Sequence, residues 1–160
     1  MKRIQDIFTH PLYQEQLSLL MDAEKDRIFC RHTVEHFLDV ARIGTIIALE
    51  EGLKINREWI YAAALLHDCG KHEQYENGIP HEQASARIAP EILKACGFND
   101  EETGVIVTAI SRHRDPEAAK EKNLNGILYR ADKASRACFA CDAEKDCNWK
   151  DGKKNLTIKY

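Results

Sequence analysis

The amino-acid sequence predicts an all-α protein, a single bundle of about six to seven helices. Apolar residues recur at helical spacing along most of the chain. N-capping residues, glycines and prolines separate these apolar segments. No stretch shows the alternation of apolar and polar residues that is typical of a half-exposed strand. At 160 residues, the chain is long enough to bury one sizeable core.

Six segments carry the helical pattern, and local signals set their ends. Pro11 opens the first, and Gly52 ends the second. Asn56 is a good N-cap for a nearly all-apolar third segment, which suits a central helix. Pro90 is expected to bend or break the fourth segment, and Asn99 or Asp100 caps the fifth. The expected helices span residues 11–29, 31–52, 56–67, 81–96, 101–113 and 124–137, and a polar loop is expected from Lys71 to Pro80.

The composition narrows the class of protein. The chain is 44% hydrophobic and 31% charged, and its net charge of −3 gives no electrostatic signal for a nucleic acid polymer. The first twenty residues include Lys2, Arg3 and Asp6 and lack an unbroken apolar run, so we expect neither a signal peptide nor a membrane span. A cytoplasmic location with reduced cysteines is expected.

The stretch from Ala62 to Lys71 is an apolar run that ends in His67 and Asp68. Burying an imidazole and a carboxylate without partners costs several kcal/mol, so a metal ion is the leading candidate to compensate them. Other expected helices place further nitrogen and carboxylate ligands beside apolar residues, as helical bundles do when they build metal centres. These further candidates are His36, His81, His113 and Asp132.

Three motifs give the chain a resemblance to the HD-domain superfamily of metal-dependent phosphohydrolases. They are His36-Phe-Leu-Asp-Val-Ala41, Ala63-Ala-Leu-Leu-His-Asp-Cys-Gly-Lys71 and Ala131-Asp132-Lys133, and the resemblance spans roughly residues 31–137. The central motif with its trailing glycine and lysine is specific, whereas a bare His-Asp pair would not be. The Gly-Tyr-Pro signature of cyclic di-GMP phosphodiesterases is missing.

The two extra histidines, His81 and His113, look like the dinuclear subgroup that includes bacterial symmetrical dinucleoside tetraphosphate hydrolases. The resemblance implies that His36, His67, Asp68 and Asp132 hold one ion, and that Asp68 bridges to a second ion held by His81 and His113. Two divalent ions can share a water and activate it as hydroxide. Iron or manganese is expected, with zinc, cobalt and nickel as alternatives.

The predicted activity is hydrolysis of a phosphate ester or anhydride in a nucleotide or small phosphorylated metabolite. No nucleic acid polymer and no membrane is expected as a partner. Two alternatives stay open: a di-iron enzyme of the oxygenase type, and a non-catalytic module that senses a nucleotide. Phosphate release, dioxygen consumption and binding without turnover distinguish the three.

Several further side chains are candidates for catalysis or substrate binding. Lys71 could hold a phosphate oxygen or leaving group, or be a solvated loop lysine. Arg112, Arg114 and Arg136 could clamp a polyphosphate, although a surface salt bridge is an equal alternative for each. His32 is expected on the same helix face as His36, where it could touch substrate or itself be a ligand. The remaining histidines, His10 and His72, are expected at the surface.

The chain divides at residue 137 into the helical domain, residues 1–137, and a short tail, residues 138–160. The tail carries Cys138, Cys141 and Cys147, one thiolate short of a closed structural zinc site. Three interpretations of these cysteines stay open: ligands of a structural metal, ligands of an iron-sulfur cluster, and ordinary reduced thiols. A fourth ligand would have to be a histidine or one of Cys30, Cys69 and Cys96.

Overall fold

The computed structural model describes residues 1–160 and confirms the all-α fold class. It contains eight α-helices and three short 3-10 helices, η1 to η3, and no strand. The α-helices are α1 (Lys2–Thr9), α2 (Pro11–Ala23), α3 (Val34–Glu50), α4 (Arg57–Leu66), α5 (Lys71–Asn77), α6 (His81–Ala95), α7 (Asp100–Arg112) and α8 (Leu124–Ala134). The 3-10 helices are η1 (Pro116–Lys120), η2 (Cys138–Ala140) and η3 (Asp151–Lys153). No helix is both long and apolar enough to span a membrane.

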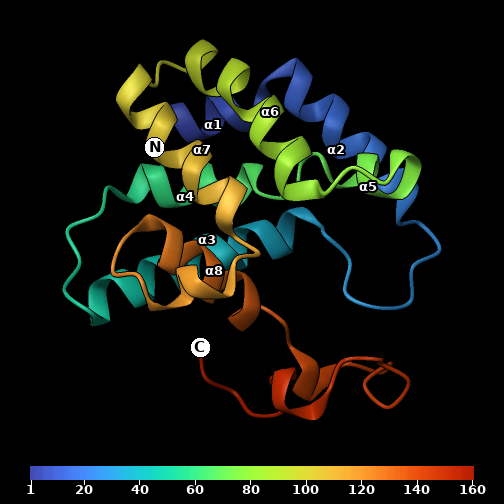
Figure 1. Ribbon diagram of the computed structural model, residues 1–160. Coiled ribbons are helices and arrows are strands. Elements are labelled where there is room, and N and C mark those ends of the chain that lie inside the picture. The colour runs from blue at the N-terminus through green and yellow to red at the C-terminus, as the bar shows by residue number, and fades with distance from the viewer.

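Helix α4 is the centre of the bundle, as its apolar sequence predicted. It contacts α1, α3, α6, α7 and α8, and Figure 1 shows it between the α6–α7 layer and the α3–α8 pair. Its three alanines allow neighbouring helices to approach closely, and Ala62, Leu65 and Leu66 are almost fully buried. The residues that follow α4 therefore emerge in the middle of the molecule.

Two helices were not predicted. Helix α1 packs on α2 and α4, and α5 occupies most of the segment expected to be a polar loop. The α5 sequence, Lys-His-Glu-Gln-Tyr-Glu-Asn, is polar but contains good helix formers, and packing against α2 and α6 supplies the stability that its pattern does not reveal. Gly78 ends this helix in the left-handed conformation, with a φ of 71°.

Helix α6 is continuous through Pro90, so the expected break does not occur. Ala89, Ile92 and Leu93 on either side of the proline are fully buried, and this packing holds the helix together across the missing hydrogen bond.

The predicted N-caps of α4 and α7 are present. The side chain of Asn56 accepts a hydrogen bond from Glu58 N, and Asn99 forms a capping box with Glu102.

Gly70 allows the residues after α4 to lie against α6. A Cβ atom at this position would be 2.7 Å from Ser85 N and 2.8 Å from Ala84 C, both backbone atoms that cannot move independently. Gly70 N also donates a hydrogen bond to Ser85 Oγ at 3.0 Å. The glycine of the central motif therefore sets the distance between the end of α4 and the start of α6.

We expect Gly70→Ala to lower the free energy of unfolding by about 1–3 kcal/mol, because the added methyl group overpacks this contact. Denaturant unfolding monitored by circular dichroism measures the change. Gly104→Ala is the matched control, since its Cβ would meet nothing within 4 Å and alanine is the better helix former. Equal stabilities for the two variants would contradict this role of Gly70.

The tail packs differently from the rest of the chain. None of residues 138–160 is buried, and Figure 1 shows this segment, in orange and red, beyond α8 and apart from the helical layers. The Asn155 side chain joins it to the end of α8 by donating to the backbone oxygens of Lys133, Ala134 and Arg136 at 2.8, 3.3 and 2.9 Å. Polar contacts, not a hydrophobic core, hold the tail in place.

Candidate metal centre

The six predicted metal ligands converge at the end of α4. They form two groups of three, and within each group the ligand atoms all lie within 4.8 Å of one another. We call His36, His67 and Asp132 the first triad, and Asp68, His81 and His113 the second triad. His36 comes from α3, His67 and Asp68 directly follow α4, His81 begins α6, His113 directly follows α7 and Asp132 lies on α8.

Asp68 faces both triads. Its Oδ1 lies 3.1 Å from His81 Nε2 and 3.6 Å from His113 Nε2. Its Oδ2 lies 3.3 Å from His67 Nε2, in the first triad. In that triad Asp132 Oδ1 is 3.8 Å from His36 Nε2 and 3.9 Å from His67 Nε2. The two oxygens of Asp68 thus point to different groups of ligands, as a bridging carboxylate requires.

The histidines present their Nε2 atoms to the centre because their Nδ1 atoms are occupied. A backbone carbonyl oxygen can only accept a hydrogen bond, so the Nδ1 atoms of His67 and His113 must carry the proton. Such an oxygen partner on the outer nitrogen is typical of metal-binding histidines. The Nδ1 partners are Ala64 O for His67 and Ile110 O for His113, both at 2.7 Å, Gln74 Oε1 for His81 at 2.5 Å and Ser135 Oγ for His36 at 3.2 Å.

This arrangement leaves buried polar atoms without partners. His36 Nε2, His67 Nε2 and Asp68 Oδ1 have no hydrogen-bond partner. In the second triad, the Nε2 atoms of His81 and His113 face each other at 3.1 Å. With both protons on Nδ1, two lone pairs meet across this gap, and a cation between them would remove the repulsion. The donor set, four imidazoles and two carboxylates, therefore fits divalent metal ions.

The charge states also suit metal binding. Burial and the neighbouring His67 lower the pKa of His36 to about 4, and burial also lowers the pKa of His81. Both rings are therefore neutral near pH 7. Burial would lower the pKa of His67 as well, but the carboxylates of Asp68 and Asp132 raise it. Burial would raise the pKa of the Asp68 carboxyl, but His67, His32 and Lys71 hold it well below its usual range. Neutral imidazoles and ionised carboxylates are the protonation states that bind metals.

Lys71 is a buried residue in the first turn of α5, not a solvated loop lysine. Its Nζ lies 3.4 Å from His81 Nδ1, on the side of the ring away from the centre.

Arg112 forms ion pairs with Asp115 and Glu121 at 2.7 and 2.6 Å. These ion pairs correspond to the surface salt bridge that the sequence left open as an alternative to substrate binding. Substrate contacts by Lys71 and Arg112 stay predictions, since neither residue lines the cavity described below.

His32 lies at the centre, but it does not lie on α3 as predicted. Thr33 is the N-cap of α3, so His32 belongs to the loop before this helix. Its Nε2 is 3.5 Å from Asp68 Oδ2, and its Nδ1 is 2.6 Å from Glu24 Oε1.

His72 was expected at the surface, and this prediction was wrong. The residue is buried in α5, and its Nε2 lies 2.8 Å from Gln16 Oε1.

Glu24, which was not among the predicted site residues, holds His32 in place. Its carboxylate accepts hydrogen bonds from His32 N at 2.7 Å and from Tyr75 Oη at 2.6 Å, besides the His32 ring. Burial would raise the pKa of Glu24, but the hydrogen bonds from His32 and Tyr75 lower it to about 2. Glu24 sits in a polar run just after α2, and nothing in that run distinguishes it from its exposed neighbours.

We expect Glu24→Gln to lower phosphate release by about 10–100-fold, the usual cost of losing a partner outside the ligand set. An amide can replace only one of the two acceptor oxygens, so either the His32 backbone N–H or its ring loses a partner. Steady-state kinetics measure the change, with Glu15→Gln, on the exposed face of α2, as the control. Identical rates for both variants would exclude a role for Glu24 in the reaction.

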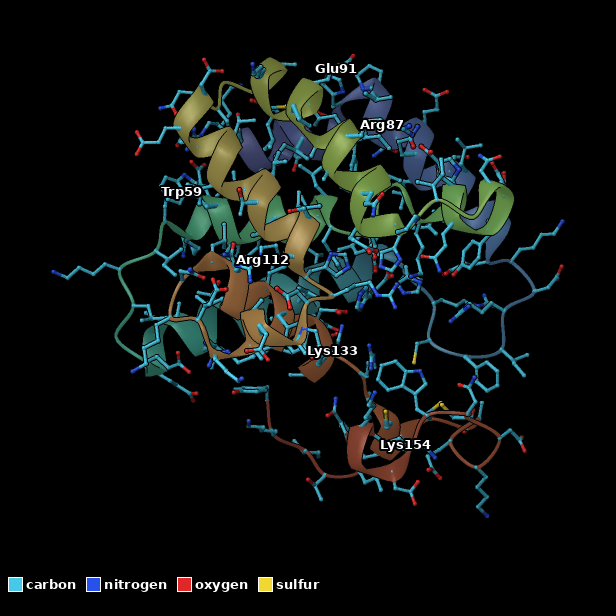
Figure 2. All side chains as sticks on the ribbon, viewed as in Figure 1. Trp59, Arg87, Glu91, Arg112, Lys133 and Lys154 are labelled. Atoms are coloured by element: carbon cyan, nitrogen blue, oxygen red, sulfur yellow. The ribbon has the colours of Figure 1, made fainter.

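A cavity of about 290 Å³ opens beside the first triad. Its walls come from the loop before α3, the start of α3, the end of α8 and the beginning of the tail. His32, His36 and Asp132 reach it from the metal centre, and Arg31 and Arg136 add positive charge. Figure 2 shows Lys133, at the end of α8, between the helical layers and the tail that carries Lys154.

Comparisons with known proteins agree with these motifs. The family model described as HD domain matches residues 33–143. An uncharacterized protein of Clostridium beijerinckii is 52% identical over 137 residues, which are 86% of this chain and 85% of that protein. Ribonuclease Y of Oleidesulfovibrio alaskensis is 29% identical over 132 residues, 82% of this chain but only 23% of the ribonuclease.

The fold is also similar to that of a solved structure. A predicted HD superfamily hydrolase from an uncultured Thermotogales bacterium superposes with a TM-score of 0.63 at 24% identity, over 89% of this chain and 81% of that one. At this identity the likeness concerns the fold alone, while the family match covers most of the chain. The chain therefore belongs to the HD domain family, the metal-dependent phosphohydrolases that its motifs resemble.

Proposed function

We propose that the protein uses a dinuclear metal centre to hydrolyse a phosphate ester or anhydride in a nucleotide or small phosphorylated metabolite. The observation that carries the proposal is the position of Asp68, whose two oxygens face the two triads. The first triad and Asp68 would hold one ion, and the second triad would hold the other. This is the ligand set expected for the dinuclear subgroup that includes symmetrical dinucleoside tetraphosphate hydrolases.

Divalent ions at this centre would act as Lewis acids, lowering the pKa of a water and neutralising phosphoryl oxygens during in-line attack. The protein itself fixes the direction of each ring through the Nδ1 contacts. His32, held by Glu24, would orient the attacked group or the water beside Asp68. Lys71, behind the His81 ring, would act by favouring the ionised state of Asp68, because its ammonium lowers the pKa of that carboxyl.

The cavity supports a small phosphorylated substrate. About 290 Å³ accommodates a compact ligand of roughly nucleotide size, near the lower limit of small-molecule sites. Arg31 and Arg136 line it on the side of the first triad and can pair with phosphate oxygens. The helical domain, residues 1–137, would supply the metal ligands, and the tail would complete the cavity wall.

A panel of nucleoside monophosphates, sugar phosphates and dinucleoside polyphosphates, assayed with iron, manganese, cobalt, nickel or zinc, tests the proposal. We expect phosphate or nucleotide release that depends on metal and disappears after chelation. Dioxygen consumption without phosphate release would favour the di-iron oxygenase alternative instead. Tight nucleotide binding with neither reaction would favour a sensing module. Either result would overturn the proposed hydrolysis.

The match to ribonuclease Y supports a second candidate, hydrolysis of a phosphodiester in RNA. Several ribonucleases Y match this chain, including that of Geotalea uraniireducens at 30% identity, but the chain covers only 22–23% of their length. The net charge of −3 and the confined cavity favour the small substrate. A fluorescent RNA oligomer in the same panel distinguishes the two, because only the second candidate requires its cleavage.

A further inference from the structure

The three cysteines of the tail lie on one run of tight turns. Cys141 N donates to Cys138 O at 3.3 Å, Glu144 N to Cys141 O at 3.1 Å, and Cys147 N to Glu144 O at 3.2 Å. Successive turns of this kind keep the three cysteines in one compact stretch. Two cysteines separated by two residues on a turn are the half-site from which structural zinc centres are built. None of the three contributes to the HD centre.

A fourth cysteine reaches the same place from the other end of the domain. Cys30, in the loop before α3, lines the cavity together with Cys138 and Cys141. Figure 2 shows sulfur atoms between this loop and the tail. The other two cysteines are unsuitable, because Cys69 and Cys96 are buried in the hydrophobic core. Among the cysteines outside the tail, Cys30 is therefore the one placed to be a fourth ligand beside Cys138, Cys141 and Cys147.

The tail is attached to the helical domain without a hydrophobic core of its own. It contains no buried residue, and its large apolar side chains, such as Trp149 and Ile158, are exposed. Its ordered contacts are polar: the Asn155 bonds to α8, the Lys154–Glu144 ion pair at 2.7 Å, and Arg136 stacked 3.7 Å above the Trp149 ring. Short segments without a core are commonly held by a structural metal.

We propose that Cys30, Cys138, Cys141 and Cys147 bind one zinc ion as a tetrahedral, four-thiolate structural site. The site fastens the tail to the loop before α3 and so fixes one wall of the substrate cavity. The only donor groups whose ligand atoms already lie within 4.8 Å of one another are the two triads of the HD centre. Zinc binding therefore requires the loop and the tail to close around the ion.

Cobalt substitution tests this site separately from the HD centre, because only sulfur ligands give the intense thiolate-to-cobalt charge-transfer absorption. We expect this absorption in the wild-type protein refolded or grown with cobalt, and a weaker absorption in Cys30→Ser and Cys138→Ser, because each change removes one thiolate ligand. Cys96→Ser, a cysteine outside the set, should keep it. Asp68→Ala should also keep it, so failure of the proposed phosphohydrolase activity would leave this result unaffected.

Thiol titration of the wild-type protein provides a test that needs no variant. We expect one zinc ion per chain to be released from thiolates by an organomercurial, and four cysteines to become reactive together once it leaves. Charge-transfer absorption that persists undiminished in Cys30→Ser would remove Cys30 from the site. Iron with acid-labile sulfide in the purified protein, or cobalt protein without thiolate absorption, would overturn the zinc assignment.

Discussion

Asp68→Ala is expected to abolish phosphate release and metal retention at both triads. The carboxylate is the only ligand whose two oxygens face different triads, at 3.3 Å from His67 and 3.1 Å from His81. Its loss would remove one ligand from each ion and the anionic group between them. We expect the rate to fall on the order of a thousandfold or more. Elemental analysis of the purified variant and a phosphate-release assay measure the two effects.

Asp26→Ala, which removes an exposed carboxylate from the loop after α2, is the matched control and should keep wild-type metal content and rate. Circular dichroism should show the same helix content in both variants, since Asp68 follows α4 and does not cap it. Normal metal content together with a normal rate in Asp68→Ala would refute the bridging assignment.

His81→Ala and His113→Ala are each expected to reduce the metal bound at the two triads from two ions toward one per chain. Their Nε2 atoms are the nitrogen donors of the second triad, while the first triad keeps all its members. The loss of rate should exceed the roughly 10–100-fold that follows removal of a partner outside the ligand set. Elemental analysis after removal of loosely bound metal, paired with kinetics, measures both quantities.

His72→Ala is the control for these variants, because His72 is also a buried histidine but belongs to neither triad. It should lose stability through its contact with Gln16 and keep its metal content. An unchanged stoichiometry in both His81→Ala and His113→Ala would mean that no second ion is bound there.

The helices could be predicted where local chemistry determines them. Asn56 and Asn99 act as the caps that the sequence indicates, and the apolar run between Ile60 and Leu66 lies in the core. Helix α5 could not be predicted because its stability comes from contacts with α2 and α6, which a polar sequence does not disclose. The break expected at Pro90 does not occur because core packing on both sides of the proline outweighs its local effect on the helix.

The candidate ligands could be named because each polar side chain interrupts an otherwise apolar helical pattern. Their division into two groups follows from the family resemblance alone, and the orientation of the Asp68 oxygens depends on distances between helices, which the sequence does not contain. Glu24 was missed because its neighbours in the chain are equally polar, and only the contact with His32 across the fold marks it. Likewise, the position of Cys30 beside Cys138 and Cys141 depends on how the tail folds back.

The order of the ligands along the chain has a consequence for protein synthesis. The second triad is complete in sequence once His113 has been made, whereas the first triad also requires Asp132 on α8. Under the proposed assignment, a nascent chain that ends between these residues would contain every ligand of the second ion but not every ligand of the first. The first ion would bind only after α8 had left the ribosome and packed against α3, so the centre would load in the direction of translation.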